Sequence, residues 1–279
     1  MAERLAEPGA ATDSSDLLAI AVPVARRAAD LVRELRARGV ADVDTKSTAT
    51  DLVTAADRAA ERLIVDLLRE ARPTDLFLGE ESGAHRAVDA APTGVRWVID
   101  PIDGTVNYVY GLPHYAVSIA AEVGGVAVAG VVRNAASGEE WTAVRGGGAW
   151  REGRRLAGSP VTELGQALVA TGFGYDAHRR AHQARVLAHL LPAVRDIRRF
   201  GASSLDLCAA AEGRVDAYFE KGLGAWDHAA GGLIAEESGL WVTGLRGVAP
   251  GPLMVLAAPP ALHRDLHDLL VTVDADGGP

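Results

Sequence analysis

The stretch WVIDPIDGTVNYVYG at residues 97–111 constrains this chain more than any other feature of its sequence. An apolar run typical of a buried strand leads into Asp100, and Asp103 follows three residues later. Carboxylates are costly to place at the end of a core strand unless a cation meets them. Pro101 interrupts a strand ladder and favours a turn. Such a turn can point both carboxylates to one side and leave the Ile102 carbonyl as a third oxygen ligand.

Other acidic residues also fall at the ends of expected elements: Asp57, Glu80 and Asp227. Each one alone is typical of a helix cap, a turn or a solvated surface. As a set with Asp100 they indicate a metal site, because adjacent strand ends can bring carboxylates together. Oxygen ligands without paired Cys or His suit Mg²⁺ or Mn²⁺ rather than a structural zinc. Two such ions about 3.5–4 Å apart can hold a phosphate and a water in line for displacement.

Composition narrows the class of protein. The chain has 279 residues, of which 48% are hydrophobic and 23% charged, which is ordinary for a globular protein. The net charge of −9 argues against a nucleic-acid binder that works by bulk electrostatics. A single cysteine, Cys208, excludes an intramolecular disulfide and fits a reducing compartment. No apolar run reaches ~18 residues, and the N-terminus lacks a signal-peptide pattern, so a cytoplasmic protein without a membrane segment is expected.

Hydrophobic periodicity predicts the order of elements. Helical spacing begins at Ser15 and ends before Gly39, although Pro23 counts against an unbroken helix in the first turns. A second helix is predicted over 54–71, and a hairpin around the Gly-Gly turn at 124–125. The second half alternates strands and helices. We expect a disordered segment over 1–14 and one domain over 15–279, made of an α+β lobe (about 15–150) and an α/β lobe (about 151–279).

Four blocks resemble the signature blocks of the inositol monophosphatase family. They are DLVTAAD (51–57), GEES (79–82), WVIDPIDGTVNYVYGLPHYAVSIA (97–120) and WDHAAGGLIAEESG (226–239). They occur in the family's order and at its separations, and the two longer blocks are highly specific. The resemblance implies a layered α-β-α-β-α sandwich of the inositol monophosphatase and fructose-1,6-bisphosphatase type, and a Mg²⁺-dependent, lithium-sensitive phosphatase.

The resemblance also implies a role for individual residues. Glu80, Asp100 and the Ile102 carbonyl match the ligands of a first Mg²⁺, and Asp100, Asp103 and Asp227 those of a second, with a weaker third ion on Glu80. Asp57 and Thr105 match the pair that orients and helps deprotonate the attacking water, with Glu80 as a further catalytic residue. The substrate contacts that it implies are Asp103, Gly104, Thr105, Gly201, Ala202, Ser203, Glu220 and Asp227.

The resemblance leaves several substrates of this superfamily possible. Glu220 and the block at 226–239 favour a small phosphorylated polyol, myo-inositol 1-phosphate. Histidinol phosphate, fructose 1,6-bisphosphate and phosphoadenosine phosphate are the alternatives, and the substitutions at Ala202 and Ser203 bear on this choice. The resemblance further implies a homodimer, and some bacterial relatives bind the transcription machinery, which is a non-enzymatic alternative.

Weaker motifs have ordinary explanations. GFGYDA (172–177) fits the dinucleotide fingerprint, but the polar HRRAH after it does not pack like the first helix of such a unit. The pairs His178/His182 and His263/His267 have metal-ligand spacing without a completing Cys or carboxylate, so surface or core histidines are expected. Lys46 matches a family lysine near the active-site loop and reads equally well as a solvated loop lysine.

Overall fold

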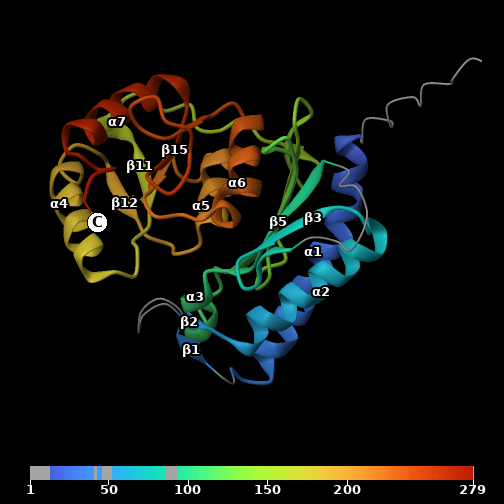
Figure 1. The fold of residues 1–279 in the computed structure, drawn as a ribbon. Coiled ribbons are helices and arrows are strands. Elements are labelled where there is room, and N and C mark those ends of the chain that lie inside the picture. The colour runs from blue at the N-terminus through green and yellow to red at the C-terminus, as the bar shows by residue number, and fades with distance from the viewer. Residues whose placement is uncertain (1–12, 41–42, 46–51, 86–93, 279) are drawn as a thin grey trace, which may run out of the picture.

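The computed structural model describes residues 13–40, 43–45, 52–85 and 94–278. Within these ranges, layers of helices alternate with two β-sheets (Figure 1). Of the segment expected to be disordered, 1–14, residues 1–12 lie outside the described residues, as does Lys46, whereas Asp13 caps α1 (Ser14–Ala37) and Ser14 begins it.

The larger sheet has eight strands in the order β10-β9-β8-β7-β6-β5-β3-β4. Its pairings are antiparallel except for β3 with β5, which is parallel. The predicted hairpin is confirmed as β6 and β7, whose turn glycines Gly124 and Gly125 both have positive φ. The strands are β3 Leu76–Gly79, β4 Gly83–His85, β5 Val95–Asp103, β6 Ala116–Val123, β7 Val126–Asn134, β8 Glu140–Val144, β9 Gly148–Arg151 and β10 Arg154–Arg155.

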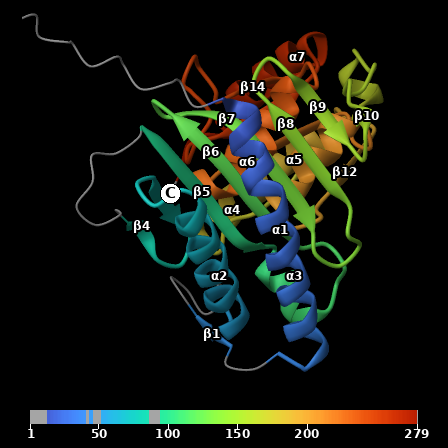
Figure 2. The same cartoon turned by 90° about the vertical axis from the view of Figure 1, so that its right-hand side faces the viewer.

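Two helices cover one face of this sheet, α1 (Ser14–Ala37) and α2 (Ala55–Ala71) (Figure 2). The helix expected from Ser15 is confirmed, and α1 continues without a break through Pro23, the residue that counted against this continuity. One face of α1 is buried on both sides of the proline, from Leu17 to Val32, and this burial offsets the missing backbone donor. The short elements β1 (Asp44–Thr45), β2 (Leu52–Val53) and α3 (Thr105–Tyr110) lie at one end of this layer (Figure 1).

A central layer separates the two sheets. It consists of α5 (Ser203–Glu212) and α6 (Ala225–Glu237), which pack against each other and against both sheets. Gly231 permits this close packing, because a Cβ there would lie 3.0 Å from the Ser204 carbonyl oxygen and from Leu207 Cβ. Nearly all residues of α5 are buried. A helix that is buried on all sides needs no polar face, which explains why this sequence has no clear amphipathic stripe.

The smaller sheet has five strands in the order β12-β11-β13-β15-β14. Its strands and helices alternate as expected; β11 pairs parallel with β12 and β13, while β15 pairs antiparallel with β13 and β14. The helices α4 (Ala177–Leu190) and α7 (Pro260–Thr272) cover its outer face (Figure 1). The other elements are η1 Leu164–Gln166, β11 Leu168–Thr171, β12 Asp196–Arg198, β13 Ala217–Glu220, β14 Trp241–Thr243 and β15 Val255–Ala258.

The resulting order of layers is helix, sheet, helix, sheet, helix, which confirms the predicted α-β-α-β-α sandwich. Within the part of the chain that the structure describes, no helix combines the length and the apolar character needed to span a membrane.

Candidate active site

Strand β5 carries the two aspartates of the 97–111 stretch, Asp100 and Asp103. The prediction that the strand ends at Asp100 is wrong, because β5 continues to Asp103. Its ladder with β6 is nevertheless irregular at this point: Asp100 pairs with Ser118, Asp103 pairs with Ala116, and the register shifts between them. Pro101 has no N–H to donate to a ladder, which accounts for this irregularity. Both aspartates are buried, at 1% and 6% relative exposure.

Two further carboxylates arrive from neighbouring elements. The parallel pairing of β3 with β5 places Gly79 beside Ile99, and the Glu80 N–H donates to the Ile99 carbonyl at 3.1 Å. Asp227 lies in the first turn of α6, where its Oδ2 accepts a 2.5 Å hydrogen bond from the Gly224 N–H. Glu80 thus follows the end of β3 and is brought alongside Asp100, which lies within β5 rather than at its end.

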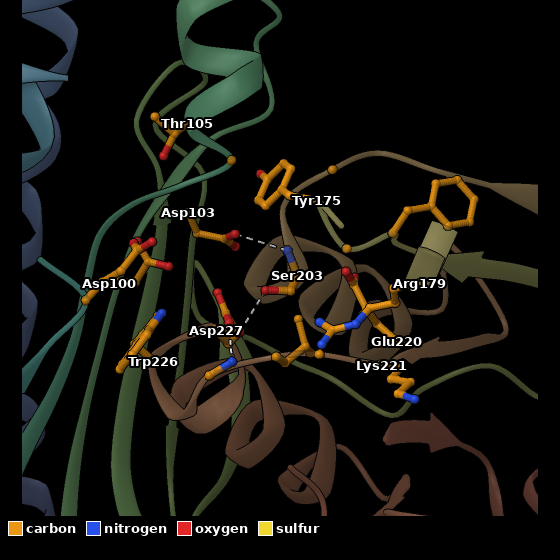
Figure 3. Close-up of a pocket in the computed structure, with 18 of the residues that line it drawn as sticks. Asp100, Asp103, Thr105, Tyr175, Arg179, Ser203, Glu220, Lys221, Trp226 and Asp227 are labelled. Carbon is orange, nitrogen blue, oxygen red and sulfur yellow. Dashed lines mark hydrogen bonds between the residues drawn. The ribbon is translucent and has the colours of Figure 1, made fainter. Parts of the chain in front are cut away.

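Asp100, Asp103 and Asp227 form one cluster (Figure 3). Each offers a carboxylate oxygen, and these oxygens lie within 4.8 Å of one another. Burial, followed by repulsion from Glu80, Asp103 and Asp227, raises the pKa of Asp100 well above its ordinary value. The pKa of Asp227 is raised for the same reasons. Uncompensated negative charge in a buried, oxygen-only cluster fits a hard divalent cation such as Mg²⁺ or Mn²⁺.

Asp103 is held from the other half of the molecule. Its two carboxylate oxygens accept hydrogen bonds from the Ser203 N–H at 3.2 Å and the Ser204 N–H at 2.7 Å. The Ser204 hydroxyl donates to the same carboxylate. Sequence reasoning did not identify Ser204, and no signal in the chain pairs it with a residue a hundred positions earlier.

Asp57 and Thr105 meet beside the cluster, as expected. The Thr105 hydroxyl lies 3.1 Å from Asp57 Oδ1 and 3.0 Å from the Ile102 carbonyl oxygen. Asp57 belongs to the capping box of α2, in which its Oδ2 accepts hydrogen bonds from the N–H and the hydroxyl of Thr54. The cap therefore fixes the carboxylate that Thr105 contacts.

The cluster opens into a pocket of about 400 Å³ (Figure 3). Burial raises the pKa of Glu220 to about 8, and the Tyr218 hydroxyl donates to its Oε2 at 2.8 Å. Ala202 differs from the other expected substrate contacts, because its side chain is buried in the core between the sheets. The pocket lining includes the following residues that the sequence indicated: Glu80, Asp100, Ile102, Asp103, Gly104, Thr105, Gly201, Ser203, Glu220 and Asp227.

Other lining residues were missed by sequence reasoning. They come from the segment after β11, from α4, and from the segments around α5 and α6. None was named as a site residue, although Trp226 lies in the block at 226–239 and residues 173–176 lie in GFGYDA. The GFGYDA motif lies here, and it contributes pocket wall next to Glu220. The missed lining residues are Phe173, Gly174, Tyr175, Asp176, Arg179, Arg199, Lys221, Gly222, Leu223, Gly224 and Trp226.

Three of the histidines that have metal-ligand spacing form hydrogen bonds with neighbouring protein groups. His182 Nε2 lies 2.9 Å from the Asp274 carbonyl oxygen, and His263 Nε2 lies 2.8 Å from the Thr243 hydroxyl. His267 accepts from the Arg246 N–H at 3.2 Å.

The sandwich and its acidic pocket define a family of enzymes. The family model described as "Inositol monophosphatase family" matches residues 13–274. The inositol-1-monophosphatase SuhB of Mycobacterium tuberculosis (strain ATCC 25618 / H37Rv) is 46% identical over 265 residues, covering 90% of this chain and 91% of the relative. The Nus factor SuhB of Escherichia coli (strain K12) is 38% identical, covering 91% of this chain and 98% of the relative.

The crystal structure of the extragenic suppressor protein suhB from Bartonella henselae has the same fold. It superposes with a TM-score of 0.85 at 34% identity, covering 91% of this chain and 98% of that one. The chain belongs to the inositol monophosphatase family. Members of this family are metal-dependent, and the clustered carboxylates are where this chain would hold a metal.

Proposed function

We propose that this protein is a Mg²⁺-dependent phosphatase that hydrolyses a small phosphate monoester, with myo-inositol 1-phosphate as its favoured substrate. The observation that carries the proposal is the meeting of Asp100, Asp103 and Asp227 within 4.8 Å at the base of a pocket, beside the Thr105–Asp57 contact. The M. tuberculosis relative named inositol-1-monophosphatase supports the choice of substrate.

The positions of the carboxylates in the pocket indicate which residues would hold each cation. Asp100 is central to the cluster and would serve two ions, the first with Glu80 and the Ile102 carbonyl, the second with Asp103 and Asp227; a weaker third ion would use Glu80. The site would hold about two to three Mg²⁺ per subunit, and Mn²⁺ could take their place. When bound, Mg²⁺ neutralises phosphate charge and lowers the pKa of bound water.

The chain's own side chains would position the attacking water. Thr105 Oγ1 borders the pocket, and Asp57 Oδ1 lies 3.1 Å behind it, so the hydroxyl can accept from a water while it donates to Asp57. Because the capping box fixes Asp57, the hydroxyl is held in one orientation. Glu80, which also lines the pocket, would accept a proton from that water.

The opposite face of the pocket would receive the rest of the substrate. On that face Ser203, Gly201 and Glu220 would contact the polyol, whereas Gly104 and Thr105, on the side of the attacking water, would meet a phosphate oxygen with their N–H groups. Ala202 would contribute through its backbone, since its side chain is buried in the core. Asp227 would assist protonation of the leaving alkoxide.

A phosphate-release panel tests this function. Myo-inositol 1-phosphate, histidinol phosphate, fructose 1,6-bisphosphate and phosphoadenosine phosphate are compared with Mg²⁺, in wild type and in Asp100→Asn. Asp30→Asn is the matched control, because Asp30 is exposed on α1 and pairs with Arg33 far from the pocket. We expect inositol 1-phosphate to lead and Asp100→Asn alone to lose activity. Another leading substrate would retain the mechanism and reassign the substrate. Equal release from all three proteins would refute the metal-site proposal.

Membership of the family also suggests the oligomeric state, the cellular compartment and the response to Li⁺. We propose a cytoplasmic homodimer that Li⁺ inhibits, and sedimentation and Li⁺ titration of the activity test the last two.

A non-enzymatic role is the second candidate, because the E. coli relative is named a Nus factor. Binding to the transcription machinery that persists in Asp100→Asn, when phosphatase activity is lost, would establish such a role as separate from catalysis. Absence of binding by wild type would remove it.

A further inference from the structure

Helix α2 carries a second buried carboxylate, one turn after Asp57. Glu61 is 3% exposed and lies on the same buried face of the helix as Asp57. It does not line the pocket, so it would not touch a substrate or a cation there. A buried carboxylate is costly unless hydrogen-bond donors meet it. The donors that Glu61 meets therefore indicate what it does.

Both carboxylate oxygens of Glu61 bind the turn between β3 and β4. Oε2 accepts a hydrogen bond from the Glu81 N–H and Oε1 accepts one from the Ser82 N–H, each at 2.9 Å. The Ser82 hydroxyl also donates to Oε1. Hydrogen bonds from peptide N–H groups to an ionised carboxylate are among the stronger ones in proteins. One side chain of α2 thus fixes two consecutive peptide groups of the turn.

The same turn carries Glu80. This residue follows β3, and its own N–H donates to the Ile99 carbonyl oxygen at 3.1 Å. Its side chain lines the pocket, and its negative charge is among the causes that raise the pKa of Asp100 and of Asp227. The main chain is therefore held at Glu80 by β5 and directly after Glu80 by α2, while the carboxylate faces the cluster.

Gly79, the last residue of β3, leaves the space that the Glu61 carboxylate occupies. A Cβ at Gly79 would lie 2.5 Å from Glu61 Cδ. Any larger residue at this position would push the carboxylate away from the peptide groups that it binds. The close contact between strand and helix thus depends on glycine at 79, directly before the residue that enters the pocket.

We propose that Glu61 is a positioning residue for Glu80: by binding the turn that follows Glu80, it orients the Glu80 carboxylate toward the cation that Glu80 would share with Asp100. The inference rests on the proposed function, in which Glu80 is a metal ligand. Loss of a group that orients a metal ligand typically reduces metal affinity about 10–100-fold. Because Asp57 and Glu61 lie one turn apart, α2 would orient both the attacking water and a metal ligand.

Titration with Mn²⁺ in the absence of substrate tests this role without depending on turnover. The EPR signal of free Mn²⁺ gives the affinity of each variant. In Glu61→Gln one of the two peptide N–H groups loses its acceptor, whichever oxygen the amide nitrogen replaces. We expect the site whose affinity Glu80→Gln reduces to bind Mn²⁺ about tenfold more weakly in Glu61→Gln.

Glu122→Gln is the matched control. Glu122 is a glutamate of the same sheet, on β6, with 7% exposure. It accepts a hydrogen bond from Arg96 Nε at 2.9 Å and does not line the pocket. Its Mn²⁺ affinity should stay within about twofold of wild type, because no pocket residue depends on it. An equal loss of affinity in Glu61→Gln and Glu122→Gln would overturn the positioning role.

A double-mutant cycle determines whether the effect of Glu61 passes through Glu80. In Glu80→Gln the carboxylate ligand is already lost, so the added Glu61→Gln change should alter Mn²⁺ affinity by less than about twofold. A general loss of packing would act whether or not Glu80 is present. Equal weakening in both backgrounds, or wild-type affinity in Glu61→Gln alone, would therefore contradict the proposal.

Gly79→Ala carries the same test if Glu61→Gln does not fold. The added Cβ displaces the Glu61 carboxylate but leaves its charge in the chain. We expect a similar loss of Mn²⁺ affinity, about tenfold. Gly165→Ala is the control, because its added Cβ meets no atom within 4 Å. Wild-type affinity in folded Gly79→Ala would overturn the role of Glu61.

Activity measurements separate this inference from the proposed function. In Glu61→Gln the Mg²⁺ concentration for half-maximal phosphate release should rise about tenfold, whereas KM for the ester at saturating Mg²⁺ stays within about twofold. If wild type hydrolyses no ester, the phosphatase function fails, and the Mn²⁺ titrations still decide the role of Glu61. Absence of Mn²⁺ binding by wild type would overturn the positioning role together with the metal site.

Discussion

Asp103 Oδ2 accepts a 2.7 Å hydrogen bond from the backbone N–H of Ser204, which connects β5 of the large sheet with the first turn of α5. Burial raises the pKa of Asp103, and the hydrogen bonds from Ser204 and Ser203 oppose that rise. Hydrogen bonds to a carboxylate favour its charged form. The central helix layer therefore helps to keep this carboxylate ionised and oriented for a cation.

Replacing Ser204 by alanine should weaken Mg²⁺ binding. The change removes the hydroxyl that donates to Asp103 and leaves the backbone N–H in place. We expect the Mg²⁺ concentration for half-maximal activity to rise about tenfold, as for other losses of a group that orients a metal ligand. Phosphate release at varied Mg²⁺ measures it. In Ser203→Ala the lost hydroxyl bonds to the Asp227 carbonyl oxygen instead, so a similar rise there would contradict the assigned role of Ser204.

Replacing Thr105 by valine should reduce turnover and leave Mg²⁺ dependence unchanged. Valine keeps the shape of the side chain but removes the hydroxyl that lies 3.1 Å from Asp57 Oδ1. We expect kcat to fall about 10²-fold or more, the usual range for a group that assists proton transfer. Thr105→Ser, which restores a hydroxyl, should recover much of the rate. A valine variant with wild-type kcat would exclude Thr105 from the positioning of water.

The sequence predicted the carboxylate cluster because its members lie in short motifs at the ends of elements. Asp100 and Asp103 share one irregular strand, and the pairing of β3 with β5 brings Glu80 alongside. The hairpin at Gly124–Gly125 and the alternating elements of the second half were accessible from local patterns, whereas the layered sandwich was implied by the resemblance of the four blocks to the inositol monophosphatase family.

The other side of the pocket could not be predicted in this way. Arg179, Arg199 and Lys221 lie on separate elements, and only tertiary packing brings them to one cavity. Periodicity and motif spacing describe local structure, so they carry no information about such contacts. The same reason explains why Ser204 was missed. The course of β5 beyond Asp100 was wrongly predicted because Pro101 disrupts the ladder without ending the strand.

Glu220→Gln should stabilise the metal-free protein increasingly as pH rises. Burial raises the pKa of Glu220 to about 8 from 4.5, so the folded protein keeps a proton that the unfolded chain releases above pH 4.5. The unfolded state then binds fewer protons, and wild-type stability declines as pH rises from 4.5 through about 8. Glutamine has no such dependence.

The measurement is urea unfolding of both proteins in EDTA at several pH values. We expect the difference in unfolding free energy to grow by roughly 1–4 kcal/mol between pH 5 and 8.5, at about 1.4 kcal/mol per pKa unit as an upper limit. Tyr218→Phe removes the donor to Glu220 Oε2 and serves as a comparison that keeps the carboxyl group. A difference that is constant with pH would show that Glu220 titrates normally in the folded protein.

Gly172→Ala should impair substrate recognition while sparing the metal site. Gly172 directly follows β11, which pairs with β13, the strand that carries Glu220. A Cβ at Gly172 would overlap the carboxylate of Glu220. The alanine must displace that carboxylate, and a displacement of about 1 Å is expected to cost roughly 10–100-fold in kcat/KM. Steady-state kinetics with inositol 1-phosphate at saturating Mg²⁺ measures the loss. Gly165→Ala is the matched control, because its added Cβ meets no atom within 4 Å. If Gly172→Ala instead raised the Mg²⁺ requirement and left kcat/KM intact at saturation, Glu220 would belong to the metal site rather than to the recognition of the substrate.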